Sequence, residues 1–285
     1  MREWDALVSF PWRLDIRYLI LTVVFHSVAL GVTFWVWHLM IVRLGDFDDL
    51  RLNFRFYYVS TLAKRIPTPV WYVGGRLMMY QSVGVSVSEV LNCVVLENVI
   101  IGIAGVFTFL VLLPFYSRLP ETNVLPLTLV GAVGILVLLT RPQVFVDVTN
   151  WILKRLRRQR LDRVPARKDI LLWGGLYILP WLVAGLSLYC VTHSFSGRVG
   201  LGIIDAIGVS TLAMLVALLS ALLPGGLGLR ELTSGVLLAY WMPFSSAIVI
   251  SFVYRLIQTA NEMFWALAAT RLSAPVVEQS KEIDP

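Results

Sequence analysis

The chain has 285 residues, of which 58% are hydrophobic and 15% are charged, and its formal net charge is +6. Soluble domains carry about 25% charged residues, so this composition and a mean hydropathy of +0.76 exclude an ordinary soluble protein. We expect an all-α, polytopic protein of the cell (cytoplasmic) membrane that forms a single transmembrane domain over residues 1–285.

Several apolar stretches are long enough to cross a bilayer, because a spanning helix needs about 20 apolar residues. The first of them follows a mixed acidic and basic N-terminus without a cleavage site for a signal peptide, so we expect it to stay in the membrane. About six spanning helices are predicted, at 18–42, 88–114, 124–140, 170–192, 199–223 and 246–270.

The first interruption of this apolar pattern lies between 52 and 80. Pro67 and Pro69 fix the backbone and remove amide donors, so a helix over about 52–66 should end there and a second should cover 70–80. The two halves would form a broken or re-entrant pair, with Pro67 and Pro69 as helix-breaking and gating residues.

Basic side chains flank this first break. Arg65 and Arg76 lie near the start of the second short helix, where free N–H groups favour an anion such as a phosphate. In the alternative interpretation they extend to the membrane interface, with Trp71 and Tyr72 in the aromatic belt.

The helix at 88–114 carries Glu97 and Asn98 within an apolar run, and a basic loop follows later in the chain. Residues 154–168 hold eight Lys or Arg against one Asp. Basic clusters can bind nucleic acid, but beside a transmembrane helix they are typical of a cytoplasmic loop near anionic lipids. We therefore expect no nucleic-acid partner.

The second interruption is sharper. A continuous helix is improbable through Pro224, Gly225, Gly226 and Gly228, and the freed backbone groups need partners or water. Arg230 and Glu231 follow at the start of the next half-helix. They either neutralise each other in a tight turn, or Arg230 faces an anionic head group while Glu231 orients it.

The last predicted helix has one polar stripe. Arg255, Gln258 and Glu262 share one face at 100° per residue, while the other faces are apolar. A charge at the bilayer centre costs about 2.5–3.5 kcal/mol on insertion scales, so this stripe should face the protein interior or a wet cavity. For such carboxylates a structural role and a proton- or ion-coupling role remain open.

The remaining polar residues give no sign of a cofactor or metal site. His26, His38 and His193 are scattered, and Cys93 and Cys190 lie in apolar runs, which favours packing roles. No phosphate-binding loop, dinucleotide fingerprint or zinc spacing occurs.

The order of segments suggests an inverted repeat. Unit one would cover 17–114 and unit two 170–270, joined by a connecting helix and the basic loop over 115–169 and followed by a polar tail over 271–285. Placing the N-terminus outside and both the 154–168 loop and the C-terminus in the cytoplasm satisfies the positive-inside rule. If 52–80 instead crosses the membrane once, several arginines fall on the outer side.

The two breaks resemble motifs of the transmembrane domain family of lysylphosphatidylglycerol synthases, a flippase-type membrane domain. The stretch LPGGLGLRE over 223–231 resembles that family's second Pro-Gly-Gly motif, and AKRIP over 63–67 with Gly75-Arg76 resembles its first. The first motif departs from the family, because Pro67-Thr68-Pro69 stands where Pro-Gly is common. Segment order extends the resemblance over most of 17–270.

The resemblance implies lipid translocation or lipid handling, with re-entrant helices around a head-group cavity. The 285 residues do not include the aminoacyl-transferase domain of the full synthases, so aminoacylation is not implied.

We therefore expect a flippase or transporter for an anionic phospholipid or a polyprenyl-phosphate-linked lipid, and thus a transporter more than an enzyme. One alternative is a membrane-embedded transferase acting on lipid-linked sugars. Another is a non-catalytic subunit that docks a glycosyltransferase or synthase through the basic loop. The sequence leaves the oligomeric state open. The candidate substrate-binding residues are Arg65, Arg76, Glu97, Asn98, Arg230, Glu231, Arg255 and Glu262.

Overall fold

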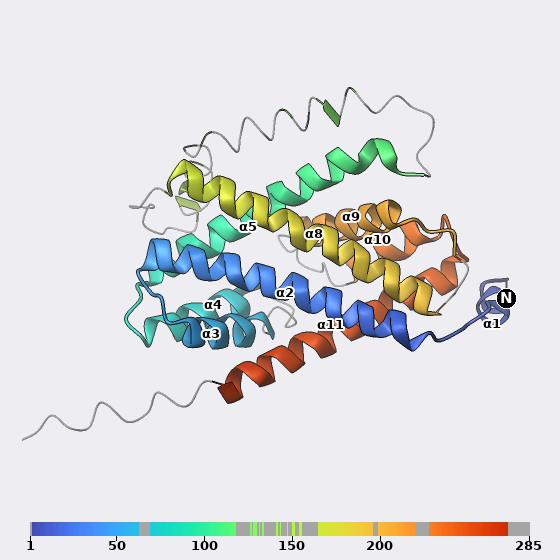
Figure 1. Ribbon diagram of the computed structural model, residues 1–285, viewed down its shortest axis with the longest axis horizontal. Helices are drawn as coiled ribbons and strands as arrows, with labels where there is room; N and C mark the ends of the chain where they lie inside the picture. Colours follow the sequence, from blue (N-terminus) through green and yellow to red (C-terminus); the bar gives the residue numbers. More distant parts are fainter. Residues whose placement is uncertain are drawn as a thin grey trace, which may run out of the picture.

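The computed structural model describes residues 2–62, 69–117, 165–195, 199–220 and 228–272, with scattered positions between 126 and 155. The regular structure of these residues is helical (Figure 1). Three helical stretches in the described part are long and apolar enough to cross a membrane: Ile16–Gly45, Val87–Phe115 and Arg167–Phe195. The prediction of an all-helical membrane protein is confirmed. The predicted span at 124–140 lies mostly outside the described residues, so the number six remains a prediction.

Two of the long helices form an antiparallel pair at the centre of the molecule. Helix α2 (Ile16–Gly45) and helix α8 (Arg167–Phe195) lie side by side in Figure 1. At one end the Asp15 amide donates to the Ser194 carbonyl at 2.8 Å. At the other end Arg43 Nε lies 3.2 Å from Asp169 Oδ2. The start of α2 therefore meets the end of α8, and the two helices run in opposite directions.

Glycines allow two neighbouring helices to approach α8 closely. A Cβ at Gly185 of α8 would lie 2.3 Å from the Ile207 Cα of helix α9 (Ile203–Ser220). A Cβ at Gly105 of helix α5 (Val87–Leu112) would lie 2.4 Å from the Trp181 ring. Small residues at such crossings permit the close backbone packing on which membrane helices depend.

The first predicted broken pair corresponds to two short helices. Helix α3 (Leu50–Leu62) and helix α4 (Pro69–Gln81) pack on each other, and α4 begins at a proline, which suits the first turn of a helix. Pro67 lies outside the described residues. Helix α3 also contacts helix α11 (Phe244–Leu272), and α4 contacts α5.

The second predicted pair corresponds to α9 and helix α10 (Leu229–Leu238). Gly228 is the N-cap of α10 with φ of 90°, a left-handed conformation that glycine adopts without steric cost. The positions Pro224, Gly225 and Gly226 lie outside the described residues. Helix α9 contacts α5 and α8, and α10 contacts α9 and α11.

The remaining described elements complete the frame. A short helix α1 (Arg2–Ser9) contacts α11, and the 3-10 turn η2 (Leu113–Phe115) extends α5. Helix α5 begins with a capping box between Ser86 and Glu89. In Figure 1 the α3–α4 pair and the α9–α10 pair lie toward opposite ends of the long α2–α8 pair.

Candidate functional site

Arg76 of α4 is completely buried between several helices. Its side chain is 0% exposed, and its Nη1 donates to Glu97 Oε2 of α5 at 3.0 Å. The Nε group donates to Ser60 Oγ of α3, also at 3.0 Å. Because a lone buried charge is costly, the carboxylate of Glu97 is what permits a guanidinium at this depth.

Aromatic rings enclose the same guanidinium group. The Cζ of Arg76 lies 4.0 Å from the ring centroid of Trp37, 4.6 Å from that of Tyr72 and 4.7 Å from that of Tyr57. Tyr72 also donates its hydroxyl to Glu97 Oε2 at 3.2 Å. The aromatic faces and the carboxylate together replace the water that would otherwise solvate Arg76. We call these five residues the buried arginine site.

Two hydrogen-bond donors near this site have no partner among the described residues. They are Arg76 Nη2 and the hydroxyl of Tyr177 on α8, both buried. Tyr177 belongs to the same buried cluster as Trp37, Tyr57 and Tyr72. Because buried donors are normally satisfied, these two groups could serve an acceptor such as a phosphate oxygen.

A second ion pair joins α10 to α11. Glu231 Oε1 lies 3.2 Å from Arg255 Nε, with side chains that are 10% and 36% exposed. The neighbouring Arg230 stands over the Tyr254 ring, with 5.9 Å between its Cζ and the ring centroid. This half of the molecule therefore also places charge beside an aromatic ring, but in a more open position.

Each ion pair joins a short helix to the long helix that follows it, and the charges are reversed between the two pairs. In the first half the short helix carries Arg76 and the following long helix carries Glu97; in the second half the short helix carries Glu231 and the long helix Arg255. Glu97 comes ten residues after the start of α5 at Val87, and Arg255 comes eleven residues after the start of α11.

Other residues of the predicted site are distributed differently. Arg65 lies outside the described residues. Asn98 is exposed, and its Nδ2 donates to the Val94 carbonyl of its own helix at 2.7 Å. It is therefore not part of the buried arginine site. Glu262 lies against His26, with 3.9 Å between Oε1 and Nε2. Gln258, which lies between Arg255 and Glu262 along α11, is buried.

Asp205, the one charged residue of the predicted 199–223 segment, has a structural place. Its carboxylate accepts hydrogen bonds from the Ser117 amide and hydroxyl, both at 2.7 Å. These contacts tie the start of α9 to the end of α5.

Sequence reasoning missed the aromatic part of the buried arginine site. It grouped Trp71 and Tyr72 as possible interface aromatics, but Trp71 is 61% exposed whereas Tyr72 is 5% exposed. Tyr72 and Arg76 are four residues apart and share a helix face, and this spacing was the available signal. Trp37 and Tyr57 come from other helices, and a single-sequence pattern does not reveal that proximity.

Comparison with known proteins identifies the chain's relatives at the family level. The family model described as "Lysylphosphatidylglycerol synthase TM region" matches residues 3–263. A search of curated proteins finds no match to the chain. The match covers most of the 285 residues, including both ion pairs, and it associates the chain with a membrane lipid-related function. The chain belongs to the family of lysylphosphatidylglycerol synthase transmembrane regions.

Proposed function

We propose that this protein moves an anionic lipid between the two leaflets of the membrane, with its head group passing between the two short-helix pairs. The observation that carries this proposal is the pair of matching ion pairs, Arg76–Glu97 and Glu231–Arg255, in a lipid-related membrane family. Charged residues inside membrane helices are costly to insert and commonly mark substrate or ion pathways.

The chemistry of the ion pairs suits a phosphate. A phosphate diester and a carboxylate compete for the same guanidinium donors. Nη2 of Arg76 in the buried arginine site and the hydroxyl of Tyr177 near it are available to a further acceptor. Arg230, which lies next to Glu231, would supply positive charge on the other side. A head group would thus exchange with a carboxylate at each arginine rather than enter an uncharged cavity.

The arrangement of helices supports two inverted halves. The first long helices of the two units, α2 and α8, are antiparallel. Contacts also correspond between halves: α3 meets α11 as α9 meets α5, and α4 meets α5 as α10 meets α11. Inverted repeats with broken helices at their interface are a common architecture of transporters.

The two ion pairs differ in exposure, which supports alternate opening. The Arg76 side chain is 0% exposed, whereas the Arg255 side chain is 36% exposed. If the halves exchange these environments, a head group released from one pair could be received at the other. We propose that this exchange is the transport step.

Lipid movement in proteoliposomes tests the proposal. A fluorescent phosphatidylglycerol on the inner leaflet should become accessible to an impermeant quencher faster with the protein than in empty liposomes. The Arg255→Gln variant should slow this at least about tenfold, the effect expected from losing a charge-assisted contact of 1.4 kcal/mol or more.

Arg271→Gln is the matched control, because Arg271 lies exposed in the last turn of the same helix. It should move lipid at the rate of the natural chain. Equal rates for the natural chain and empty liposomes, or for Arg255→Gln and the natural chain, would contradict the proposal.

A further inference from the structure

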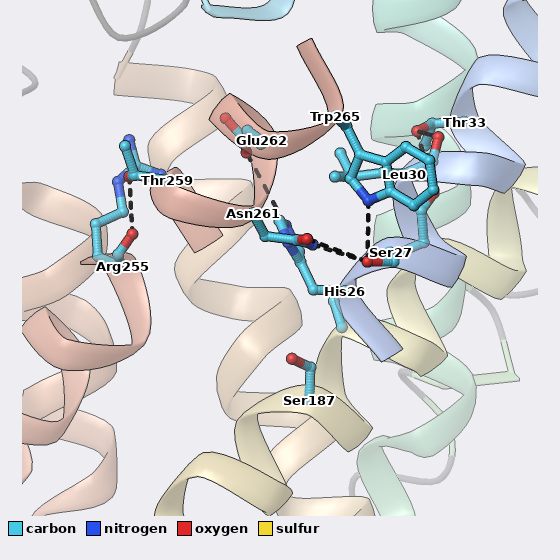
Figure 2. A network of polar contacts seen from close by, with 12 residues as sticks. His26, Ser27, Leu30, Thr33, Ser187, Arg255, Thr259, Asn261, Glu262 and Trp265 are labelled. Carbon is cyan, nitrogen blue, oxygen red and sulfur yellow. Dashed lines mark hydrogen bonds and ion pairs between the residues drawn. The ribbon is translucent and has the colours of Figure 1, made fainter. Parts of the chain in front are cut away.

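A chain of hydrogen bonds connects Trp265 on α11 to His26 on α2. Trp265 Nε1 donates to Ser27 Oγ at 3.0 Å, and Ser27 Oγ donates to Asn261 Oδ1 at 3.2 Å. Asn261 Nδ2 then lies 3.0 Å from His26 Nδ1. Figure 2 shows these side chains converging between the two helices. The contacts join a helix of the first half to a helix of the second.

The same arrangement recurs near the other end of α2. Trp37 Nε1 donates to the Tyr80 hydroxyl at 2.8 Å, and that hydroxyl donates to Asn53 Oδ1 at 2.6 Å. Asn53 Nδ2 lies 2.9 Å from His38 Nδ1 and also donates to the Phe47 carbonyl. Both histidines of α2 are therefore oriented by an asparagine, a hydroxyl and a tryptophan.

The direction of these bonds determines the histidine tautomer. An indole N–H can only donate, so the Ser27 hydroxyl accepts from Trp265; it also accepts from Asn261 Nδ2 at 3.0 Å and donates to Asn261 Oδ1. An amide nitrogen can likewise only donate, so Asn261 Nδ2 donates to His26 Nδ1. The neutral His26 ring must carry its hydrogen on Nε2, the atom that faces Glu262.

His26 and Glu262 are poised to share a proton. Their side chains are 8% and 13% exposed, and Nε2 is 3.9 Å from Oε1. This separation is longer than a hydrogen bond, so the neutral ring is not yet bound to the carboxylate. Because Nε2 already carries a hydrogen, the added proton goes to Nδ1 and displaces the hydrogen bond from Asn261 Nδ2. The charged ring would then close the gap to Glu262, because charge-assisted N–H···O bonds are about 2.7–2.9 Å long.

We propose that His26 and Glu262 form a proton-binding site between the two halves of the molecule. The neutral ring and the carboxylate together carry a charge of −1, and one proton taken from water makes the pair neutral overall. We further infer, as a step that rests on the proposed lipid movement, that this proton is the coupling ion. Uptake or release of this proton alters the contact between α2 and α11, and thus the contact between the two proposed halves.

The neighbouring helices carry other ionisable groups. Arg255 of α11 pairs with Glu231, and Arg76 and Glu97 pair with each other. Tyr254 of α11 donates to the Ala184 carbonyl of α8, Tyr58 of α3 stacks on Trp265, and Cys190 of α8 is buried. Asp48 is a carboxylate that acts electrostatically on His38.

A cleft at the surface of the bundle reaches Ser27 and Asn261, which lie beside the site. It has a volume of about 470 Å³ and lies between α2 and α11, with Val23 and Phe264 among its apolar walls. Ser27 and Asn261 supply its polar lining. The hydrogen-bond chain that orients His26 is therefore reachable from outside the helix packing.

Nitrogen NMR of histidine-labelled protein in lipid nanodiscs tests the proton site directly, since the chain has three histidines. His26 should show the Nε2–H tautomer at high pH and an imidazolium after a transition between about pH 5 and 8. Glu262→Gln should remove that transition from this range. His38, which has the same hydrogen-bond chain, is the internal control and should respond to pH as in the natural chain.

A His26 signal that shows the Nδ1–H tautomer, or a transition that is unchanged in Glu262→Gln, would overturn the proton site. Coupling has a separate readout. One pH unit across the membrane should drive up to about tenfold asymmetry of the fluorescent lipid if one proton is coupled, and Glu262→Gln should abolish this asymmetry. If the NMR transition is present but the protein moves no lipid, the proposed transport function is wrong and the proton site still stands. Lipid movement that ignores the gradient would overturn the coupling.

Discussion

At the scale of single residues, the most unusual side chain is Arg76, which is charged and wholly inside the molecule. Its guanidinium group is enclosed by Trp37, Tyr57 and Tyr72, so its solvation comes from aromatic faces and from one carboxylate. Removing that carboxylate would leave a buried, uncompensated charge.

We predict that Glu97→Gln lowers the free energy of unfolding by about 3–5 kcal/mol, the usual result of breaking a buried pair from one side. Thermal unfolding in detergent, followed by tryptophan fluorescence, measures this. The double variant Arg76→Met/Glu97→Leu should be more stable than the single variant, because it removes both charges.

Asp5→Asn is the control for the same chemical change at an exposed carboxylate of α1. It should unfold like the natural chain. If Glu97→Gln is as stable as Asp5→Asn, the Arg76–Glu97 ion pair does not stabilise the folded protein.

The sequence indicated which residues carry charge in the membrane, but not how they pair. Arg76 and Glu231 were named from their places beside the two breaks, and Glu97 and Arg255 from their apolar helices. Their partners are set by contacts between helices far apart in the chain, which depend on side-chain packing rather than on spacing. For the same reason the link from His26 to Glu262, across 236 positions, has no local signal.

At the scale of helices, glycine positions decide how closely the elements approach. Gly185 faces the backbone of α9, whereas a Cβ added at Gly175 on the same helix would have no neighbouring atom within 4 Å. The two residues therefore separate the effect of close packing from that of helix propensity.

Gly185→Ala should destabilise the protein by about 1–3 kcal/mol, because its Cβ would meet the Ile207 backbone and force α8 and α9 apart. Gly175→Ala should be neutral or slightly stabilising, since alanine favours helix more than glycine does. Thermal unfolding of both variants under one condition gives the comparison, and equal stabilities would contradict the close crossing.

Gly228 sets the start of α10 and so the position of Glu231. Gly228→Ala should cost about 1–2 kcal/mol, because alanine is strained at φ of 90°. It should also slow the proposed lipid movement. Gly84→Ala imposes similar strain at φ of 88° in the turn before α5, far along the chain from α10. If both variants slow transport equally, the position of α10 has no special part in it.

The helix positions were the most predictable part of the fold. Predicted segments such as 18–42 and 170–192 fall within α2 and α8, because length and apolar composition determine spanning helices directly. The half-helix predicted after the second break ends at Leu238, where the chain turns toward α11. Turns of this kind depend on what the following element packs against.

At the scale of the whole molecule, orientation in the membrane remains a prediction from charge. A variant with Cys93→Ala and Cys190→Ala provides a background without its two buried thiols. In that background, Asp5→Cys should react with an impermeant maleimide in intact cells. Lys154→Cys should react only after permeabilisation. The reverse pattern would place the N-terminus in the cytoplasm.

Contacts at both ends of the α2–α8 pair limit how the two proposed halves can move. Sliding one helix along the other would break the Asp15–Ser194 and Arg43–Asp169 contacts together. A rocking motion about the shared long axis of the helices preserves both. We therefore predict that this pair acts as the pivot of the proposed movement.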